Sequence, residues 1–336
     1  MFFYGDLKEK IEVGTDTVVC PVKGCKQRVE RMRKGAPNRL DAYLEKDGSI
    51  ELSSDLAKYF CGEHGIFITP STFIYKDFKK NLLWLKEDEE LFRKILEKKR
   101  VKAQLHHDKS EDAVTWNVIR YLEKNDLLPR FLESVSNRSV LDPKVIYWSY
   151  DQSNGGVWSE LRCARKEFGE HEKRSSEPDI IITSKSALYF IEAKFTSKNV
   201  STPSNRDDPK KYVTGGNNWY DLVFKSPYKV IAIDKKKYEL LRLWLLGTWT
   251  ARLGKDFYLI NLTLDERERT SEKDFNKHIN ESERRKFKRI TWEEIYKYIL
   301  TNSPQGQSKD IILRFFRDKT RGYDSGILKK AFSIDY

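Results

Sequence analysis

Two carboxylates and an amine are grouped in one short stretch of the chain. Asp179 is separated from Glu192 by twelve residues, and Lys194 follows Glu192 after a single alanine. Two runs rich in β-branched and aromatic residues, at 180–183 and 188–195, flank a polar turn. The pattern predicts a β-hairpin that brings the three charged groups together.

The position of the turn sets the register of this hairpin. If the turn is centred between Lys185 and Ser186, antiparallel partners have residue numbers that sum to 371, and Asp179 faces Glu192. Directly opposed residues share a face of the sheet, with Cβ atoms roughly 5 Å apart. Lys194 lies on the same face, about 7 Å farther along the strand.

Such a group of side chains suits a divalent metal ion. Two neighbouring carboxylates repel each other, and one would hold a proton at neutral pH unless a cation lies beside them. Mg²⁺ binds carboxylate oxygens at roughly 2.0–2.1 Å and keeps several waters. A metal-bound water next to a lysine is a nucleophile for a phosphodiester. We expect Asp179 and Glu192 to be ligands, the Ala193 carbonyl to be an additional ligand, and Lys194 to position the water.

A surface hairpin with a Glu–Lys ion pair is the alternative interpretation. Residues on both faces of the two strands are apolar, however, which is typical of a buried central pair. Charges in such a place need a reason, because an unpaired buried charge is costly. The sequence therefore favours a functional site.

The order of these residues resembles the motif of the PD-(D/E)xK nuclease superfamily. The motif consists of Pro178 and Asp179, the spacer of twelve residues, and the tripeptide from Glu192 to Lys194. The resemblance implies a restriction-endonuclease-like α/β fold, with an αβββαβ core and a mixed central sheet. It also implies Mg²⁺ or Mn²⁺ as the cofactor and hydrolysis of phosphodiester bonds in DNA as the activity.

An acid at the start of a predicted helix is a further candidate. Asp108 with Glu111 three residues later is typical of a helix N-terminus. Glu111 falls on the inward-facing stripe with Thr115, Val118 and Leu122. Many superfamily members take an acidic residue from the first core helix, so the resemblance implies that Glu111 completes or bridges the metal shell. The alternative is a first-turn acid that interacts with the helix dipole.

Other segments supply the remaining expected elements of the core. Residues 155–161 are expected to form a strand, in which Glu160 is either a further metal-approaching acid or an ordinary polar residue of an edge strand. Residues 238–253 are apolar almost all round, which predicts a helix buried against the sheet. Residues 257–262 are expected to form the last strand.

Three of the four cysteines and one histidine have the spacing of a zinc site. Four residues separate Cys20 from Cys25, and two separate Cys61 from His64. This spacing suits a tetrahedral Cys₃His site and resembles treble-clef or ribbon-like zinc fingers. Four protein ligands close the shell, so the metal would be structural; three buried thiols and an ordinary histidine are the alternative. The loop after Cys25 also carries basic residues suited to phosphate: Lys26, Arg28, Arg31, Arg33, Lys34 and Arg39.

The chain has 336 residues, enough for two or more domains. We expect a zinc-finger-like module at 1–75 and a helical linker at 76–107. The nuclease-like domain would occupy 108–300, with a core at about 108–264, and a helical tail would follow at 301–336.

Charge and hydropathy limit the partners of the protein. The 63 basic and 51 acidic residues give a net charge of +12, which favours a polyanion such as nucleic acid. No apolar stretch approaches the ~20 residues that span a membrane, and the start lacks the features of a signal peptide; we expect a cytoplasmic protein.

The predicted function is that of a Mg²⁺-dependent nuclease acting on DNA as an endonuclease, with a zinc module that aids binding of substrate or partner. A catalytically silent DNA-binding or assembly protein on the same fold, an RNA-directed nuclease, and a protein partner or homo-oligomer stay open.

Overall fold

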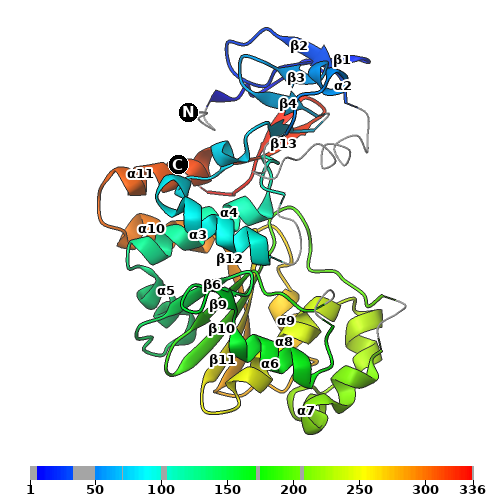
Figure 1. Cartoon of the computed structure of the whole chain (residues 1–336), viewed down its shortest axis with the longest axis vertical. Helices are drawn as coiled ribbons and strands as arrows, with labels where there is room; N and C mark the ends of the chain where they lie inside the picture. Colours follow the sequence, from blue (N-terminus) through cyan, green and yellow to red (C-terminus); the bar gives the residue numbers. More distant parts are fainter. Residues whose placement is uncertain are drawn as a thin grey trace. The chain divides into compact units, whose positions relative to one another are not determined.

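The computed structural model describes residues 6–32, 50–69, 71–99, 104–171, 175–204 and 208–334. The chain divides into two compact units (Figure 1). Unit 1 comprises Met1–Glu87, Gln104–Tyr121 and Ser303–Tyr336. Unit 2 comprises Asp88–Ala103 and Leu122–Asn302. The consecutive boundaries expected from the sequence remain a prediction.

Within the described residues, a mixed sheet of seven strands forms the centre of unit 2 (Figure 1). In order across the sheet, the strands are β12 (Arg285–Thr291), β11 (Asp256–Thr263), β10 (Ala187–Ala193), β9 (Ile180–Thr183), β6 (Lys144–Tyr147), β7 (Tyr150–Asp151) and β8 (Gly156–Val157). Strand β9 is antiparallel to both of its neighbours, whereas β10, β11 and β12 run parallel. The protein therefore has a mixed α/β architecture.

The predicted hairpin is confirmed in its register. Leu188 pairs with Thr183 and Ile191 pairs with Ile180, so partner numbers sum to 371. Every residue of β10 is buried, because β10 also pairs with β11 and β9 also pairs with β6. The surface-hairpin alternative is thereby excluded.

Helix α8 (Tyr238–Ala251) covers one face of this sheet. The expected buried helix is confirmed, and its apolar residues join the core cluster that contains Leu188, Phe190 and Phe257. Gly247 allows the close approach, since a Cβ there would lie 2.0 Å from the Phe257 ring. Two further helices pack against α8: α6 (Ser159–Glu167) and α7 (Lys210–Val223) (Figure 1).

Two helices of unit 2 contact each other beside the opposite face. They are α5 (Leu128–Ser136) and α10 (Trp292–Asn302), joined by an edge contact between Phe131 and Tyr298. The Tyr258 hydroxyl of β11 donates to the Ser136 carbonyl at 3.4 Å. Smaller elements of unit 2 are the π-helical turn η5 (Val230–Asp234) and α9 (Ser271–Asn276).

The strand expected at 155–161 is wrong for most of its length. Only β8 is extended, and Ser159 begins helix α6. Two real strands, β6 and β12, were not foreseen. Strand β6 has four residues, too few for a clear alternation, and β12 is an edge strand whose many charges hide its pattern.

Small sheets make up much of unit 1. Strands β3, β4 and β5 form one antiparallel sheet, and β1–β2 and β13–β14 are separate antiparallel pairs. The elements are β1 (Thr17–Val19), β2 (Arg28–Glu30), α2 (Ser54–Ala57), β3 (Phe60–Cys61), β4 (Ile66–Ile68), β5 (Phe73–Tyr75), η3 (Phe78–Asn81), α11 (Gln307–Asp318), β13 (Thr320–Asp324) and β14 (Ile327–Lys330).

The last hairpin of the chain packs on its first described residues. Lys10 forms an isolated antiparallel β-bridge with Ile327, and the Tyr323 hydroxyl donates to the Lys8 carbonyl at 2.8 Å. The segment 301–336 thus contains a β-hairpin as well as helix α11. Unit 1 therefore joins residues from both ends of the sequence.

Two helices run from unit 1 into unit 2: α3 (Leu85–Lys98) and α4 (Glu111–Lys124). The expected cap of α4 is wrong, because the Ser110 hydroxyl, not Asp108, accepts the N–H of Ala113 at 3.1 Å. Asp108 is fully buried instead and faces the Lys319 ammonium at 3.4 Å. None of the helices in the described ranges has the length and apolar character that crossing a bilayer requires.

Candidate active site and metal cluster

One row of residues crosses the sheet of unit 2 at the end of β10. Glu192 lies beside Asn261 of β11, which lies beside Arg289 of β12. Continuing the register of β9 by one residue places Asp179 opposite Glu192 on one side and Trp148 on the other. The sheet therefore brings the two predicted acids together on one face.

The carboxylate of Asp179 is held from two sides. Its Oδ2 accepts the backbone N–H of Ala193 at 2.8 Å, and its Oδ1 accepts the indole N–H of Trp148 at 3.3 Å. Its carbonyl accepts the backbone N–H of Trp148 at 2.9 Å. Both oxygens are thus oriented by the two strands that flank β9.

Glu192 is a buried acid with one unused oxygen. The Lys194 ammonium donates to its Oε1. Among the residues that the structure describes, no group donates to the other oxygen, Oε2, which is buried. Burial raises the pKa of the Glu192 carboxyl well above its usual value; the negative charge of Glu239 adds to the rise, and Lys194 opposes it. A cation at Oε2 would relieve this unfavourable environment.

Glu239 is a further acid of the site that the sequence analysis missed. It lies in the first turn of α8, and its Oε2 is 3.4 Å from the Lys194 ammonium. The Ser201 hydroxyl accepts its backbone N–H at 2.8 Å, which fixes the start of the helix. The only signal in the sequence was its position in the first turn of a predicted helix, where acids are common.

The backbone that follows Glu192 is anchored by neighbouring elements. The N–H of Lys194 donates to the Leu262 carbonyl at 2.7 Å, and the Lys194 carbonyl accepts the indole N–H of Trp292 at 3.1 Å. The Arg267 guanidinium donates to the Thr196 carbonyl at 2.7 Å. Strand β11 and helix α10 therefore hold the lysine in place.

Two other predicted acids stand apart from this group. Glu111 is the first residue of α4 and belongs to unit 1, so its approach to the acids of unit 2 stays a prediction. Glu160 is exposed in the first turn of α6, where its carboxylate accepts the Ser159 hydroxyl at 2.6 Å. The strand expected to aim Glu160 at the metal is absent at that residue.

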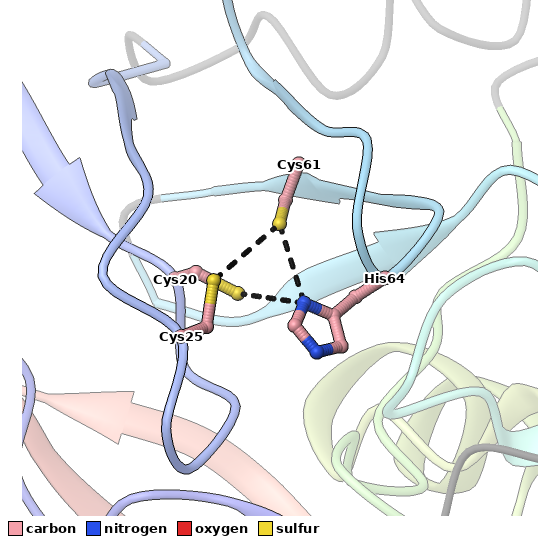
Figure 2. A group of neighbouring side chains, drawn as sticks. All are labelled: Cys20, Cys25, Cys61 and His64. Carbon is pink, nitrogen blue, oxygen red and sulfur yellow. Dashed lines mark hydrogen bonds between the residues drawn. The ribbon is translucent and has the colours of Figure 1, made fainter.

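The cysteines and the histidine predicted for zinc meet in unit 1. Cys20 follows β1, Cys25 lies in the turn before β2, Cys61 ends β3, and His64 lies in the turn before β4 (Figure 2). One ligand atom from each residue lies within 4.8 Å of all the others. Figure 2 shows the four side chains pointing toward a common centre.

The spacing of these atoms suits a tetrahedral metal ion. The Cys25 and Cys61 sulfurs are 3.9 Å apart, and His64 Nδ1 lies 3.4 Å from the Cys61 sulfur and 3.7 Å from that of Cys20. With zinc–ligand bonds of roughly 2.0–2.3 Å, tetrahedral ligand atoms lie about 3.5–4 Å apart. The donor set and the separations both fit zinc.

Both ligand turns use left-handed glycines. Gly24 has φ 78° and Gly65 has φ 65°, values that favour glycine. The Lys8 ammonium donates to the carbonyls of Cys20 and Cys25, at 2.9 and 2.6 Å. These two hydrogen bonds fix the backbone of two residues of the cluster.

The thiols of the cluster differ in pKa. A hydrogen bond between Cys20 and Cys61 raises the pKa of Cys20 and lowers that of Cys61 to about 5. Burial raises the pKa of Cys25.

Of the predicted basic loop, Lys26, Arg28 and Arg31 are exposed. Three further members, Arg33, Lys34 and Arg39, lie outside the described residues.

A comparison with known protein families finds a match over most of the chain. A family described as restriction endonuclease associating with ARP matches residues 53–319. That span contains the acids of unit 2, Lys194 and two of the four cluster residues, whereas Cys20 and Cys25 precede it. No curated protein and no solved structure matches the chain.

Proposed function

The chain belongs to the family of restriction endonucleases associating with ARP, and on that premise we propose that it is a metal-dependent nuclease. Its reaction would be hydrolysis of phosphodiester bonds in DNA, as an endonuclease. The observation that carries the proposal is the buried Glu192, whose Oε2 has no donor among the described residues, beside Asp179 and Lys194. The net charge of +12 supports a nucleic-acid substrate.

The order of elements supports a PD-(D/E)xK core. We assign α4, β6, β9, β10, α8 and β11, in that order along the chain, to the αβββαβ pattern. Strand β6 takes the place first given to residues 155–161. The remaining strands of the sheet, β7, β8 and β12, are additions at its two edges.

Asp179 and Glu192 would hold Mg²⁺ or Mn²⁺, with the Ala193 carbonyl as an additional ligand and Glu111 completing the shell. The residues fit such an ion in charge. Glu192 and Glu239 lie beside the Lys194 ammonium, and the charge of Asp179 also acts on Glu192, so the site supplies the carboxylate oxygens that such an ion prefers. When bound, the ion would acidify a water and neutralise charge on the phosphate.

The chain's own groups would orient the reactants. The N–H groups of Ala193 and Trp148 keep the Asp179 oxygens aimed in one direction. The Lys194 ammonium, held by Glu192 and Glu239, would stabilise negative charge that develops on the phosphate and position the attacking water. Preorganised donors of this kind need no rearrangement during the reaction.

We propose that the cluster of Cys20, Cys25, Cys61 and His64 holds a structural Zn²⁺. Four protein ligands leave no open coordination position. The exposed basic residues of the same loop would contact substrate or a partner. The family description names ARP as an associate, which supports a protein partner for this chain as well.

The first test is a plasmid-nicking assay with Mg²⁺ or Mn²⁺. We expect the wild type to cut, and Asp179→Asn and Lys194→Ala to lose activity by about 100-fold or more. Glu160→Gln, an exposed acid of the same unit, is the matched control and should cut normally.

Equal activity of all four proteins would mean that the site is misplaced. Parallel assays on single- and double-stranded DNA and RNA decide the substrate. A wild type that binds DNA but cuts with neither metal would instead be a silent binding protein on the same fold.

A further inference from the structure

A strained turn lies next to Asp179. Tyr147 pairs with Tyr150, so Trp148 and Ser149 form a two-residue turn between β6 and β7. Both residues have left-handed backbones, with φ 43° for Trp148 and 69° for Ser149. Such turns prefer Asn-Gly, because a larger residue in this conformation costs on the order of 1–3 kcal/mol.

Trp148 is unfavourable in that turn, yet it donates two hydrogen bonds to Asp179. Its backbone N–H donates to the Asp179 carbonyl at 2.9 Å, and its indole N–H donates to Oδ1 at 3.3 Å. The side chain is 1 % exposed. The Lys99 ammonium lies 4.9 Å from the centre of its ring.

The surroundings force the turn to keep its conformation. The Ser149 hydroxyl accepts the Arg165 guanidinium at 3.0 Å, and the Ser149 carbonyl accepts the Trp158 N–H at 2.9 Å. Strained backbone persists only where neighbouring contacts determine it, and it is concentrated at functional sites. Asparagine or glycine would suit the turn better but would lack an indole N–H in reach of the carboxylate.

We propose that Trp148 is a positioning residue that sets the Asp179 carboxylate for metal binding. The inference rests on the proposed function. With one N–H on Oδ1 from Trp148 and one on Oδ2 from Ala193, the carboxylate cannot rotate freely. Outer groups that orient a metal ligand in this way typically contribute 10- to 100-fold in metal affinity.

The test measures Mn²⁺ binding to the free, full-length protein by titration calorimetry. Trp148→Phe keeps an aromatic ring and removes the N–H, and we expect it to bind Mn²⁺ about tenfold more weakly. Trp244→Phe is the matched control. Trp244 is equally buried and its indole also donates to a protein acceptor, the Val223 carbonyl at 3.0 Å. The control should bind Mn²⁺ like the wild type.

A second measurement compares the wild type with Asp179→Asn and does not depend on the stability of Trp148→Phe. In protein labelled with ¹⁵N at its eight tryptophans, Asp179→Asn should shift one indole resonance. We expect the same resonance to shift when Mg²⁺ is added to the wild type.

The outcomes separate this inference from the proposed function. If Trp148→Phe and the wild type bind Mn²⁺ with equal affinity, the proposed role of Trp148 is wrong, but the nuclease site is not affected. The same conclusion follows if the indole resonance that shifts in Asp179→Asn does not shift when Mg²⁺ is added. No indole that responds to Asp179→Asn also overturns it. A wild type that binds no Mn²⁺ overturns both.

Discussion

At the scale of a single residue, the buried acid Glu192 destabilises the folded protein when no metal is bound. The residue is 2 % exposed, and one oxygen of its carboxylate is without a donor among the described residues. Burial raises its pKa well above the usual 4.5. A buried acid of this kind destabilises the metal-free fold, so its presence points to a ligand that binds there.

We predict that Glu192→Gln stabilises the protein in buffer without added Mg²⁺. Because the folded pKa of Glu192 lies above the unfolded value, the folded wild type binds the proton more tightly. Its stability therefore falls as pH rises above about 4.5, through the range up to the folded pKa. Glu192→Gln lacks this fall in stability with pH, because glutamine does not ionise. In the variant, the Lys194 ammonium still has Glu239 as a charged partner. The advantage of the variant should grow with pH in thermal melts.

Added Mn²⁺ should reverse the order, since it stabilises only a protein that binds it. Glu160→Gln serves as the control, because that acid is exposed. A wild type more stable than Glu192→Gln at pH 8 without added metal would contradict the expectation.

At this scale, the motif residues could be predicted and their supporting residues could not. Asp179, Glu192 and Lys194 follow from chain-local spacing and a hairpin register. Glu239 and Trp148 reach the site only because α8 and the β6–β7 turn pack beside it. The local sequence around Glu239 and Trp148 does not predict that these residues pack beside the site.

At the scale of elements, two turns build the metal cluster of unit 1. The turn after β1 brings Cys20 and Cys25, and the turn between β3 and β4 brings Cys61 and His64. Short strands such as these bury little apolar surface, so a metal is an effective crosslink between them.

We predict about one zinc atom per chain by elemental analysis. Cys61→Ser should lose that zinc and lower the melting temperature of unit 1, because the metal links the two turns. Cys163→Ser is the control, since Cys163 is an exposed cysteine outside the cluster. Retention of zinc by Cys61→Ser would show that the cluster is not the site.

Elements with strong patterns were predictable, whereas short or charged ones were not. The helix at 238–253 and the strand at 257–262 appear as α8 and β11. The failure at 155–161 arose because a two-residue strand leads directly into a helix. Pairing with partners distant in sequence, not local propensity, makes β6 and β12 strands.

At the scale of the whole chain, unit 1 depends on a buried ion pair between distant residues. Lys319, at the end of α11, and Asp108, before α4, are both fully buried, and their charged atoms lie 3.4 Å apart. The Thr320 hydroxyl also donates to Asp108, at 3.1 Å. Burial lowers the pKa of Lys319, and Asp108 opposes that change.

We predict that Lys319→Met destabilises the protein by about 3–5 kcal/mol, because it leaves the Asp108 charge buried without its partner. The double variant with Asp108→Asn should recover part of the loss. Urea unfolding measures both, and Lys329→Met, at an exposed lysine of the same C-terminal hairpin, is the control. A loss no larger than that of the control would show that the pair contributes little.

The proposed nuclease activity requires that Asp179 and Glu192 bind one divalent ion beside Lys194. The most direct measurement is an anomalous difference map from crystals grown with Mn²⁺. We predict a peak between the Asp179 and Glu192 carboxylates that disappears in Asp179→Asn. A wild-type map with no peak there, from a protein that still cuts DNA, would contradict the proposed metal site.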